Sequence, residues 1–460
     1  MVFAGAAVAV LALLVGVHRY VWRRFVGDTT AKGGAARRVG TVAMFVLPLL
    51  SVGALVSSRA GVPFRVQQVL AWPGYLWLAA LLYLTLALLV GEAVRPVLRR
   101  VLARRNARSA AAGDAAAGTD TPAVTTTATT ATTATTATAS ADDAVPRAEP
   151  GTASSTEAAS APASGTRTET EPRTETEAPA APSVADPSRR LFVARAVGGA
   201  AALAGLGTVG YGTYGVLRGP RVKRITVPLA KLPRSAHGFR IAVVSDIHLG
   251  PILGRAHTQR IVDSINATRP DMVAVVGDLV DGSVADLGRA AEPLAGLEAR
   301  HGSYFVTGNH EYFSGAAEWV DHVRELGLHP LENARVEIGS FDLAGVNDVA
   351  GESEGQGPDF VAALGDRDRG RASVLLAHQP VVIHDAVEHG VDLQLSGHTH
   401  GGQLWPGNFL AELANPTVAG LERYGDTQLY VSRGAGAWGP PVRVGAASDI
   451  TVVELASKQA

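Results

Sequence analysis

The sequence Gly-His-Thr-His-Gly-Gly-Gln at residues 397–403 constrains the chain more than any other segment. Two histidines two residues apart place both imidazoles on the same side of an extended backbone. The flanking glycines permit tight turns and let the backbone approach a ligand closely. This pattern is typical of a metal site, but His398 and His400 cannot complete one, so further ligands must come from elsewhere in the chain.

Four earlier segments offer such ligands, and each follows a short apolar run. These are Asp246 with His248, Asp278 with Asp281, Asn309 with His310 and Glu311, and His378. The apolar runs at 241–244, 272–276, 304–306 and 374–376 are typical of buried strands. Sites in open α/β sheets form beyond the carboxyl ends of strands. We therefore expect five strand ends to meet around one cluster of Asp, His and Asn.

The first 108 residues contain three long apolar runs, at 2–17, 41–56 and 69–90. Arg-rich stretches follow the first and the third. The runs could be core helices of a soluble domain, but three runs this long and uncharged are typical of transmembrane helices. We predict a membrane region with three transmembrane helices over 1–108. The positive-inside rule places both Arg-rich stretches in the cytoplasm and the N-terminus outside.

Residues 109–187 are dominated by Thr, Ala, Ser, Pro and Glu, which predicts a disordered linker because such a composition cannot form a core. Arg189 and Arg190 then precede an uncharged run at 196–217. This pattern over 188–220 resembles a twin-arginine export signal and equally fits a fourth transmembrane anchor. Both interpretations carry the following domain, 221–460, across the membrane. We expect the segment to remain as an anchor, although cleavage stays open.

Composition narrows the chemistry further. The net charge is −1, so no bulk attraction to nucleic acid is implied, and the chain lacks cysteine. Disulfides and thiolate zinc sites are therefore excluded. Apolar strand-like runs alternate with amphipathic stretches from residue 221 onward, which predicts one α/β domain.

The ordered blocks Asp-x-His, Gly-Asp-x-x-Asp, Gly-Asn-His-Glu, His and Gly-His-x-His are similar to those of the calcineurin-like metallophosphoesterase family. All five lie between residues 241 and 403, and the resemblance extends over about 222–455. Within the family the chain most resembles bacterial phosphodiesterases that are exported or membrane-anchored. The resemblance implies a four-layer sandwich of two mixed sheets flanked by helices.

The resemblance also implies a role for each motif residue. One metal ion would be held by Asp246, His248 and His400, and a second by Asn309, His378 and His398. Asp278 would bridge both ions. His310 would not be a ligand but would stand near the leaving-group oxygen and donate a proton or a hydrogen bond.

These residue types suit the implied chemistry. Two divalent ions about 3.5–4 Å apart can share a hydroxide that attacks phosphorus in line. Ligands without thiolate suit Mn, Fe or Zn, and the sequence does not choose among them. His310 would protonate the leaving group. Asp281 is expected to orient Asn309 from outside the ligand set.

The remaining candidates receive structural interpretations. Glu311 ends its motif without a ligand role. Surface or capping roles are expected for the histidines outside the motifs, namely His257, His301, His322, His329, His384 and His389.

Two departures narrow the substrate. Asp281 is followed by Gly282 and Ser283, where the Ser/Thr phosphatases of this family have Arg-Gly, so a phosphoprotein substrate is disfavoured. No basic patch interleaved with aromatic residues is present, which leaves a nuclease as a weaker alternative. We predict a phosphodiesterase acting on a lipid-linked, envelope or nucleotide-sugar-lipid substrate at the outer side of the membrane. The alternative from another class is a non-catalytic binding or sensing module on a membrane anchor.

Overall fold

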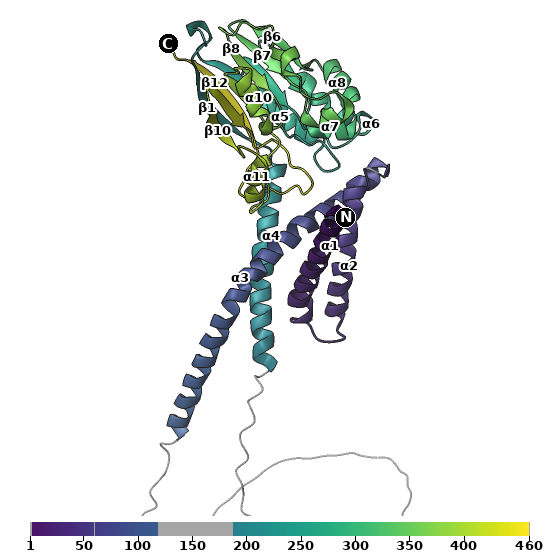
Figure 1. Cartoon of the computed structure of the whole chain (residues 1–460). Coiled ribbons are helices and arrows are strands. Elements are labelled where there is room, and N and C mark those ends of the chain that lie inside the picture. The colour runs from purple at the N-terminus through teal and green to yellow at the C-terminus, as the bar shows by residue number, and fades with distance from the viewer. Residues whose placement is uncertain (1, 59, 118–186, 460) are drawn as a thin grey trace, which may run out of the picture. The chain divides into compact units, whose positions relative to one another are not determined.

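The computed structural model describes residues 2–58, 60–117 and 187–459 (Figure 1). The described residues up to Arg99 and from Pro187 onward form the first compact unit, and the end of helix α3 (Phe64–Ala117) from Arg100 onward does not belong to it. Every strand among the described residues belongs to the first unit.

The first sheet has six strands and is mixed. Strands β2 to β5 run parallel, β12 is antiparallel to β2, and β1 is parallel to β12. The core of this sheet reads as unbroken apolar sequence because its strands are covered on both faces, and all five residues of β3 are buried. In spatial order the strands are β1 (Arg221–Leu229), β12 (Asp449–Ser457), β2 (Phe239–Val244), β3 (Met272–Val276), β4 (Ser303–Val306) and β5 (His329–Pro330).

The second sheet also has six strands, with a parallel centre and antiparallel edges. Strands β11, β9, β8 and β7 are parallel neighbours, while β10 and β6 pair antiparallel at the two sides. In spatial order the strands are β10 (Gly420–Tyr424), β11 (Thr427–Val431), β9 (Leu393–Ser396), β8 (Ala372–Leu376), β7 (Phe341–Gly345) and β6 (Ala334–Ile338).

Helices cover the outer face of each sheet. A buried cluster that includes Ile261, Leu287 and Trp319 joins α5 (Arg255–Ala267), α6 (Val284–Ala291) and α8 (Ala316–Glu325) to the first sheet. A second cluster joins α9 (Phe360–Leu364) and α10 (Ile383–Glu388) to the second sheet. A third contains Ile241 and Leu395 and fills the space between the sheets. The predicted four-layer sandwich of two mixed sheets is confirmed.

Four long helices lie outside the sandwich: α1 (Val2–Trp22), α2 (Ala35–Val56), α3 (Phe64–Ala117) and α4 (Pro187–Leu217). Three helical segments among the described residues are long and apolar enough to cross a membrane, namely Ala35–Val56, Phe64–Ser109 and Arg190–Leu217. They support a membrane protein. The first predicted span falls in α1, which is not among these three, so its crossing remains a prediction.

The start of the linker differs from the prediction. Helix α3 continues to Ala117, whereas the composition placed the boundary after residue 108. The added turns contain six alanines, and alanine has the highest helix propensity, so the helix extends past the last arginines. Residues 118–186 of the predicted linker lie outside the described residues.

Candidate metal centre

Strand order brings the predicted ligands together. Parallel neighbours β2, β3 and β4 end just before Asp246, Asp278 and Asn309, and parallel neighbours β8 and β9 end just before His378 and His398. The carboxyl ends of parallel strands lie at one edge of a sheet, and both edges face the same site. The prediction that these strand ends converge is confirmed.

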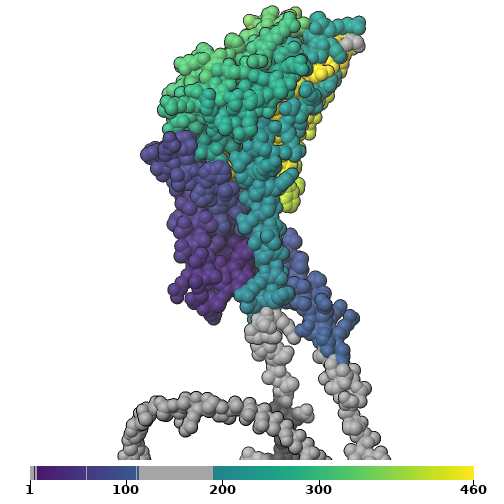
Figure 2. Space-filling view, turned by 180° about the vertical axis from the view of Figure 1, so that it is seen from behind, coloured from purple at the N-terminus to yellow at the C-terminus, as the bar shows by residue number. Residues whose placement is uncertain are grey.

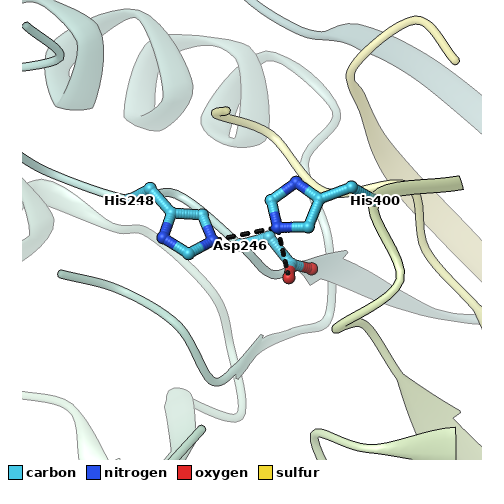
Figure 3. Close-up of side chains that lie close together, drawn as sticks. All are labelled: Asp246, His248 and His400. Atoms are coloured by element: carbon cyan, nitrogen blue, oxygen red, sulfur yellow. Dashed lines mark hydrogen bonds and ion pairs between the residues drawn. The ribbon is translucent and has the colours of Figure 1, made fainter. Parts of the chain in front are cut away.

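Asp246, His248 and His400 form the first ligand cluster, and all three side chains are buried (Figure 3). The Nε2 atoms of His248 and His400 face each other at 3.0 Å, and His400 Nε2 lies 3.4 Å from Asp246 Oδ1. Two ring nitrogens facing each other beside a carboxylate bring three groups of the metal-ligand type to one point. Such a set suits a divalent cation.

Asp278, His378 and His398 form the second ligand cluster, with the amide of Asn309 beside them. His378 Nε2 lies 3.2 Å from Asp278 Oδ2, and His398 Nδ1 lies 3.0 Å from Asn309 Oδ1. His378 Nδ1 is 2.9 Å from the carbonyl oxygen of Val276, which can only accept, so Nδ1 carries the proton. In the neutral ring the lone pair of His378 therefore sits on Nε2 and faces the cluster.

The buried Nε2 atom of His378 has no hydrogen-bond partner among the described residues. Buried polar atoms are nearly always satisfied, so an exception needs a physical cause. A cation in the second ligand cluster would take up this lone pair. The donor set of carboxylate, imidazole and amide fits a divalent ion of the Mn, Fe or Zn type.

Asp278 belongs to both clusters by position. Its Oδ2 atom lies 3.2 Å from His378 Nε2 and 3.7 Å from His248 Nε2. Burial raises the pKa of Asp278, but the charges of His378 and His248 outweigh it and hold the pKa well below the usual value. The carboxylate is therefore ionised. Its Oδ2 atom faces one histidine of each cluster.

Relatives support the same interpretation. A family model described as calcineurin-like phosphoesterase matches residues 239–402. A metallophosphoesterase of Helicobacter pylori strain J99 is 38% identical over 259 residues, covering 56% of this chain and 69% of that protein. The chain belongs to the calcineurin-like metallophosphoesterase family.

Two further relatives show how far the likeness extends. A metallophosphoesterase of Aquifex aeolicus strain VF5 is 34% identical over 243 residues, covering 52% of this chain and 92% of that protein. A "Transmembrane protein with metallophosphoesterase domain" of Danio rerio is 40% identical over 259 residues, covering 53% of this chain and 59% of that protein. The match thus spans less than two thirds of the Danio rerio relative.

The metallophosphoesterase site imposes an unusual backbone on its ligands. Asp246, His248, Asp278, His398 and His400 all have positive φ, between 49° and 73°. Non-glycine residues rarely adopt this region, and such strain persists only where the surrounding structure holds it. Asp and His are among the non-glycine residues that tolerate this region best, but residue type alone does not predict where the chain adopts it.

Two glycines allow the ligand loops to approach closely. A Cβ atom at Gly308 would lie against the Asp278 carboxylate, and one at Gly397 would lie against Ser245 and the Asp246 carboxylate. Any larger residue would displace the ligands. This explains why glycine precedes both the Asn-His and the His-x-His motif of the metallophosphoesterase sequence.

His310 stands beside both ligand clusters without entering either one's core. Its Nδ1 atom lies 2.6 Å from Asp281 Oδ1, and its Nε2 atom lies 4.0 Å from Asp278 Oδ2. The aromatic rings of Phe313 and Trp438 contact the His310 ring at centroid distances of 5.5 and 5.9 Å. His310 is therefore oriented by Asp281 and lies within a partly aromatic rim.

Asp281 occupies a different place from the one predicted. It was expected to orient Asn309, but its Oδ1 atom contacts His310 and lies 2.9 Å from His248 Nδ1. Burial raises the pKa of Asp281, but the charges of His248 and His310 outweigh it and lower the pKa to about 2. The ionised carboxylate accepts hydrogen bonds from the Nδ1 atoms of both histidines. Asp281, three residues after Asp278, therefore lies beside the first ligand cluster and not beside Asn309.

Glu311 fits its predicted structural role. Its buried carboxylate accepts backbone N–H groups from Asp278 and Leu279, after β3, and from Gly308, after β4, at 2.6–3.0 Å. It thereby joins two ligand loops. The histidines outside the motifs belong to none of the ligand groups among the described residues. The predicted surface or capping role is wrong for His257, which is buried and has no hydrogen-bond partner for either ring nitrogen among these residues.

Arg443 is a supporting residue that the sequence did not reveal. It is buried, its Nη2 atom lies 3.0 Å from His400 Nδ1, and its Nη1 atom donates to the His400 carbonyl. The guanidinium can only donate, so it fixes the orientation of the His400 ring. Arg443 is 43 residues from its partner and outside every motif, which is why spacing could not identify it.

Proposed function

We propose that the chain is a metal-dependent phosphoesterase that cleaves phosphodiesters at a centre of two divalent ions. Asp246, His248 and His400 would hold the first ion. Asn309, His378 and His398 would hold the second, and Asp278 would bridge. The convergence of two groups of carboxylate and imidazole ligand atoms, each group lying within 4.8 Å, carries this proposal.

Bound ions would supply Lewis-acid polarisation of the phosphoryl oxygens and a nucleophile derived from water at neutral pH. The contribution of His310 follows from its own contacts. Asp281 accepts a hydrogen bond from His310 Nδ1. The other ring nitrogen, Nε2, faces Asp278. In its protonated form His310 would donate from Nε2 to the departing oxygen.

The rim of the site favours a diester over a monoester. The exposed side chains of Phe313 and Trp438 beside His310 would accommodate an apolar substituent of a diester. These features support a lipid-linked or envelope phosphodiester.

The activity test uses the full chain purified in detergent, with bis-p-nitrophenyl phosphate and p-nitrophenyl phosphate as substrates. We expect diester hydrolysis that requires Mn²⁺, ends with a chelator and is absent from Asp278→Asn. A preference for the monoester would refute the diester assignment. Metal binding without hydrolysis of either compound would favour a binding module, and preferred cleavage of single-stranded DNA would favour a nuclease.

We also propose that the catalytic domain faces the outer side of the membrane, with the linker in the cytoplasm. Arg189, Arg190 and Arg195 precede the apolar part of α4, and moving these charges across the bilayer would be costly. A reporter that works only outside the cytoplasm should be active when fused after Leu455 and silent when fused near Pro150. The reverse pattern would contradict both this orientation and an envelope substrate.

A further inference from the structure

The loop at 404–417 exposes apolar side chains that no described part of the protein covers. Its helix α11 (Asn408–Ala414) has no buried residue. Phe409, Leu410 and Leu413 are 57, 71 and 85% exposed, and Trp405 at the start of the loop is 50% exposed. Scattered single apolar residues are normal on a surface, but four within nine positions form a patch that marks an interaction site.

The base of this loop is attached to two predicted transmembrane helices. The hydroxyl of Tyr83, in the apolar run of α3, donates to the Trp405 carbonyl at 3.0 Å. Leu404 packs into a cluster that contains Leu84 of α3 and Val209 of α4. The base of the patch is therefore held against the packed faces of α3 and α4, next to the apolar runs of both helices.

Helix α4 indicates the depth of the attachment. Residues 443 and 444 join the loop to α4. The Trp405 N–H donates to the Val444 carbonyl, and the Arg443 N–H donates to the Gly212 carbonyl of α4. Gly212 lies five residues before the end of α4 at Leu217, or about 7.5 Å along the helix axis. The uncharged run 196–217 is about 33 Å long, close to the hydrocarbon thickness of a bilayer. The attachment to α4 thus lies within the apolar run, near the end of α4 that leads into the catalytic domain.

We propose that the 404–417 loop is seated in the lipid bilayer, with α11 in the interfacial layer. Lipid is the occupant that removes exposed apolar surface from water at this depth without a second protein. Glu412 is the one charged residue of α11 and would keep the helix near the headgroups. The yellow-green segment of the loop projects from the surface in the space-filling view (Figure 2).

The same loop also connects to the rim of the metal centre. Gln403 Nε2 donates to the Trp438 carbonyl at 2.9 Å, and Gln403 Oε1 accepts from the Trp438 backbone N–H at 3.0 Å. Trp438 in turn contacts the His310 ring. A bilayer-seated α11 would thus hold the aromatic rim near the headgroup layer, where a lipid-borne phosphodiester lies.

The chain contains no cysteine, so a single introduced cysteine can carry one fluorescent label. Leu413→Cys and Leu410→Cys would be labelled with bimane in the full chain, in nanodiscs of phosphatidylcholine and phosphatidylglycerol. Val361→Cys is the matched control, because Val361 is also an apolar residue and is 71% exposed, on α9 of the catalytic domain. Nitroxide lipids quench labels in the bilayer, and iodide quenches labels in water.

We expect the labels at 413 and 410 to lose most of their emission to nitroxide lipid and little to iodide, with the reverse at 361. Iodide quenching at 413 and 410 equal to that at 361 would overturn the proposal. Protection from both quenchers would also overturn it, because it would indicate a protein occupant. The measurement needs no catalysis, so its failure leaves the proposed phosphodiesterase activity standing.

Discussion

The two ligand clusters hold their histidines by different means. In the first, charged side chains fix the rings, with Asp281 on His248 Nδ1 and Arg443 on His400 Nδ1. In the second, a backbone carbonyl fixes His378. A substitution of Asp281 or Arg443 removes a charged partner in a buried site, whereas the backbone carbonyl of Val276 stays in place whatever its side chain. We therefore expect single substitutions outside the ligands to weaken binding of the first metal more than binding of the second.

Removing the residue shared by the clusters should have the largest effect. Asp278→Ala leaves each ion a ligand short, so both metals and all diesterase activity should be lost. His398→Ala is the matched comparison and should release mainly the second ion. Elemental analysis after desalting measures both outcomes, and full occupancy of two metals in Asp278→Ala would disprove the bridging role.

His310 should matter for rate and not for metal content. His310→Ala should lower the rate of diester hydrolysis by about 10²–10⁴-fold if the ring donates a proton. The loss should shrink with a p-nitrophenol leaving group, because this group needs little protonation. Rates for a series of leaving groups test this, and equal losses across the series would indicate that His310 only positions the phosphate.

The charged supports give the sharpest test of the difference between the clusters. Asp281→Asn should weaken the first metal by about 10–100-fold, as is typical when a partner of a metal-bound histidine is lost, and should spare the second. Arg443→Met should weaken the first metal less and leave His310 unchanged, because the guanidinium orients the His400 ring but cannot accept a proton from its Nδ1 atom. Titration of each variant with Mn²⁺ separates the two sites. Equal weakening of both ions would contradict the division into two clusters.

The fold and the ligand set could be predicted from the sequence because their signals are local. Short apolar runs followed by Asp, Asn or His identify strand ends such as those of β2 and β3. The supports could not be predicted in this way. Arg443 reaches His400 from 43 residues away, and the orientation of Asp281 depends on where His248 and His310 lie in space. Long-range contacts leave no periodic pattern in a single chain.

The apolar loop at 404–417 was also missed, for a different reason. Its helix α11 has seven residues, which is too short for a transmembrane pattern, and its apolar residues do not form a stripe with a polar opposite face. Only the exposure of Leu410 and Leu413 in the folded protein reveals the patch.

His257 on α5 should affect the stability of the protein and not the binding of substrate. This ring is buried, both of its nitrogens lack hydrogen-bond partners among the described residues, and burial lowers its pKa to about 4, with further lowering by the charges of Arg260 and Arg443. A histidine in the unfolded chain titrates near 6.5. The folded state therefore binds fewer protons between these values, so stability is complete above about pH 6.5 and falls as the pH decreases toward 4.

The difference of about 2.5 pKa units corresponds to roughly 3 kcal/mol at the acid end of this window. His257→Leu should remove this part of the acid sensitivity, and His384→Leu, at an exposed histidine, should not. Thermal melting of the full chain in detergent between pH 7.5 and 4.5 measures the change. If protonated His257 repels Arg443 and so disturbs His400, the first metal should also be released at a higher pH from the natural chain than from His257→Leu. If the natural chain and His257→Leu release the first metal at the same pH, protonation of His257 does not disturb Arg443 or His400.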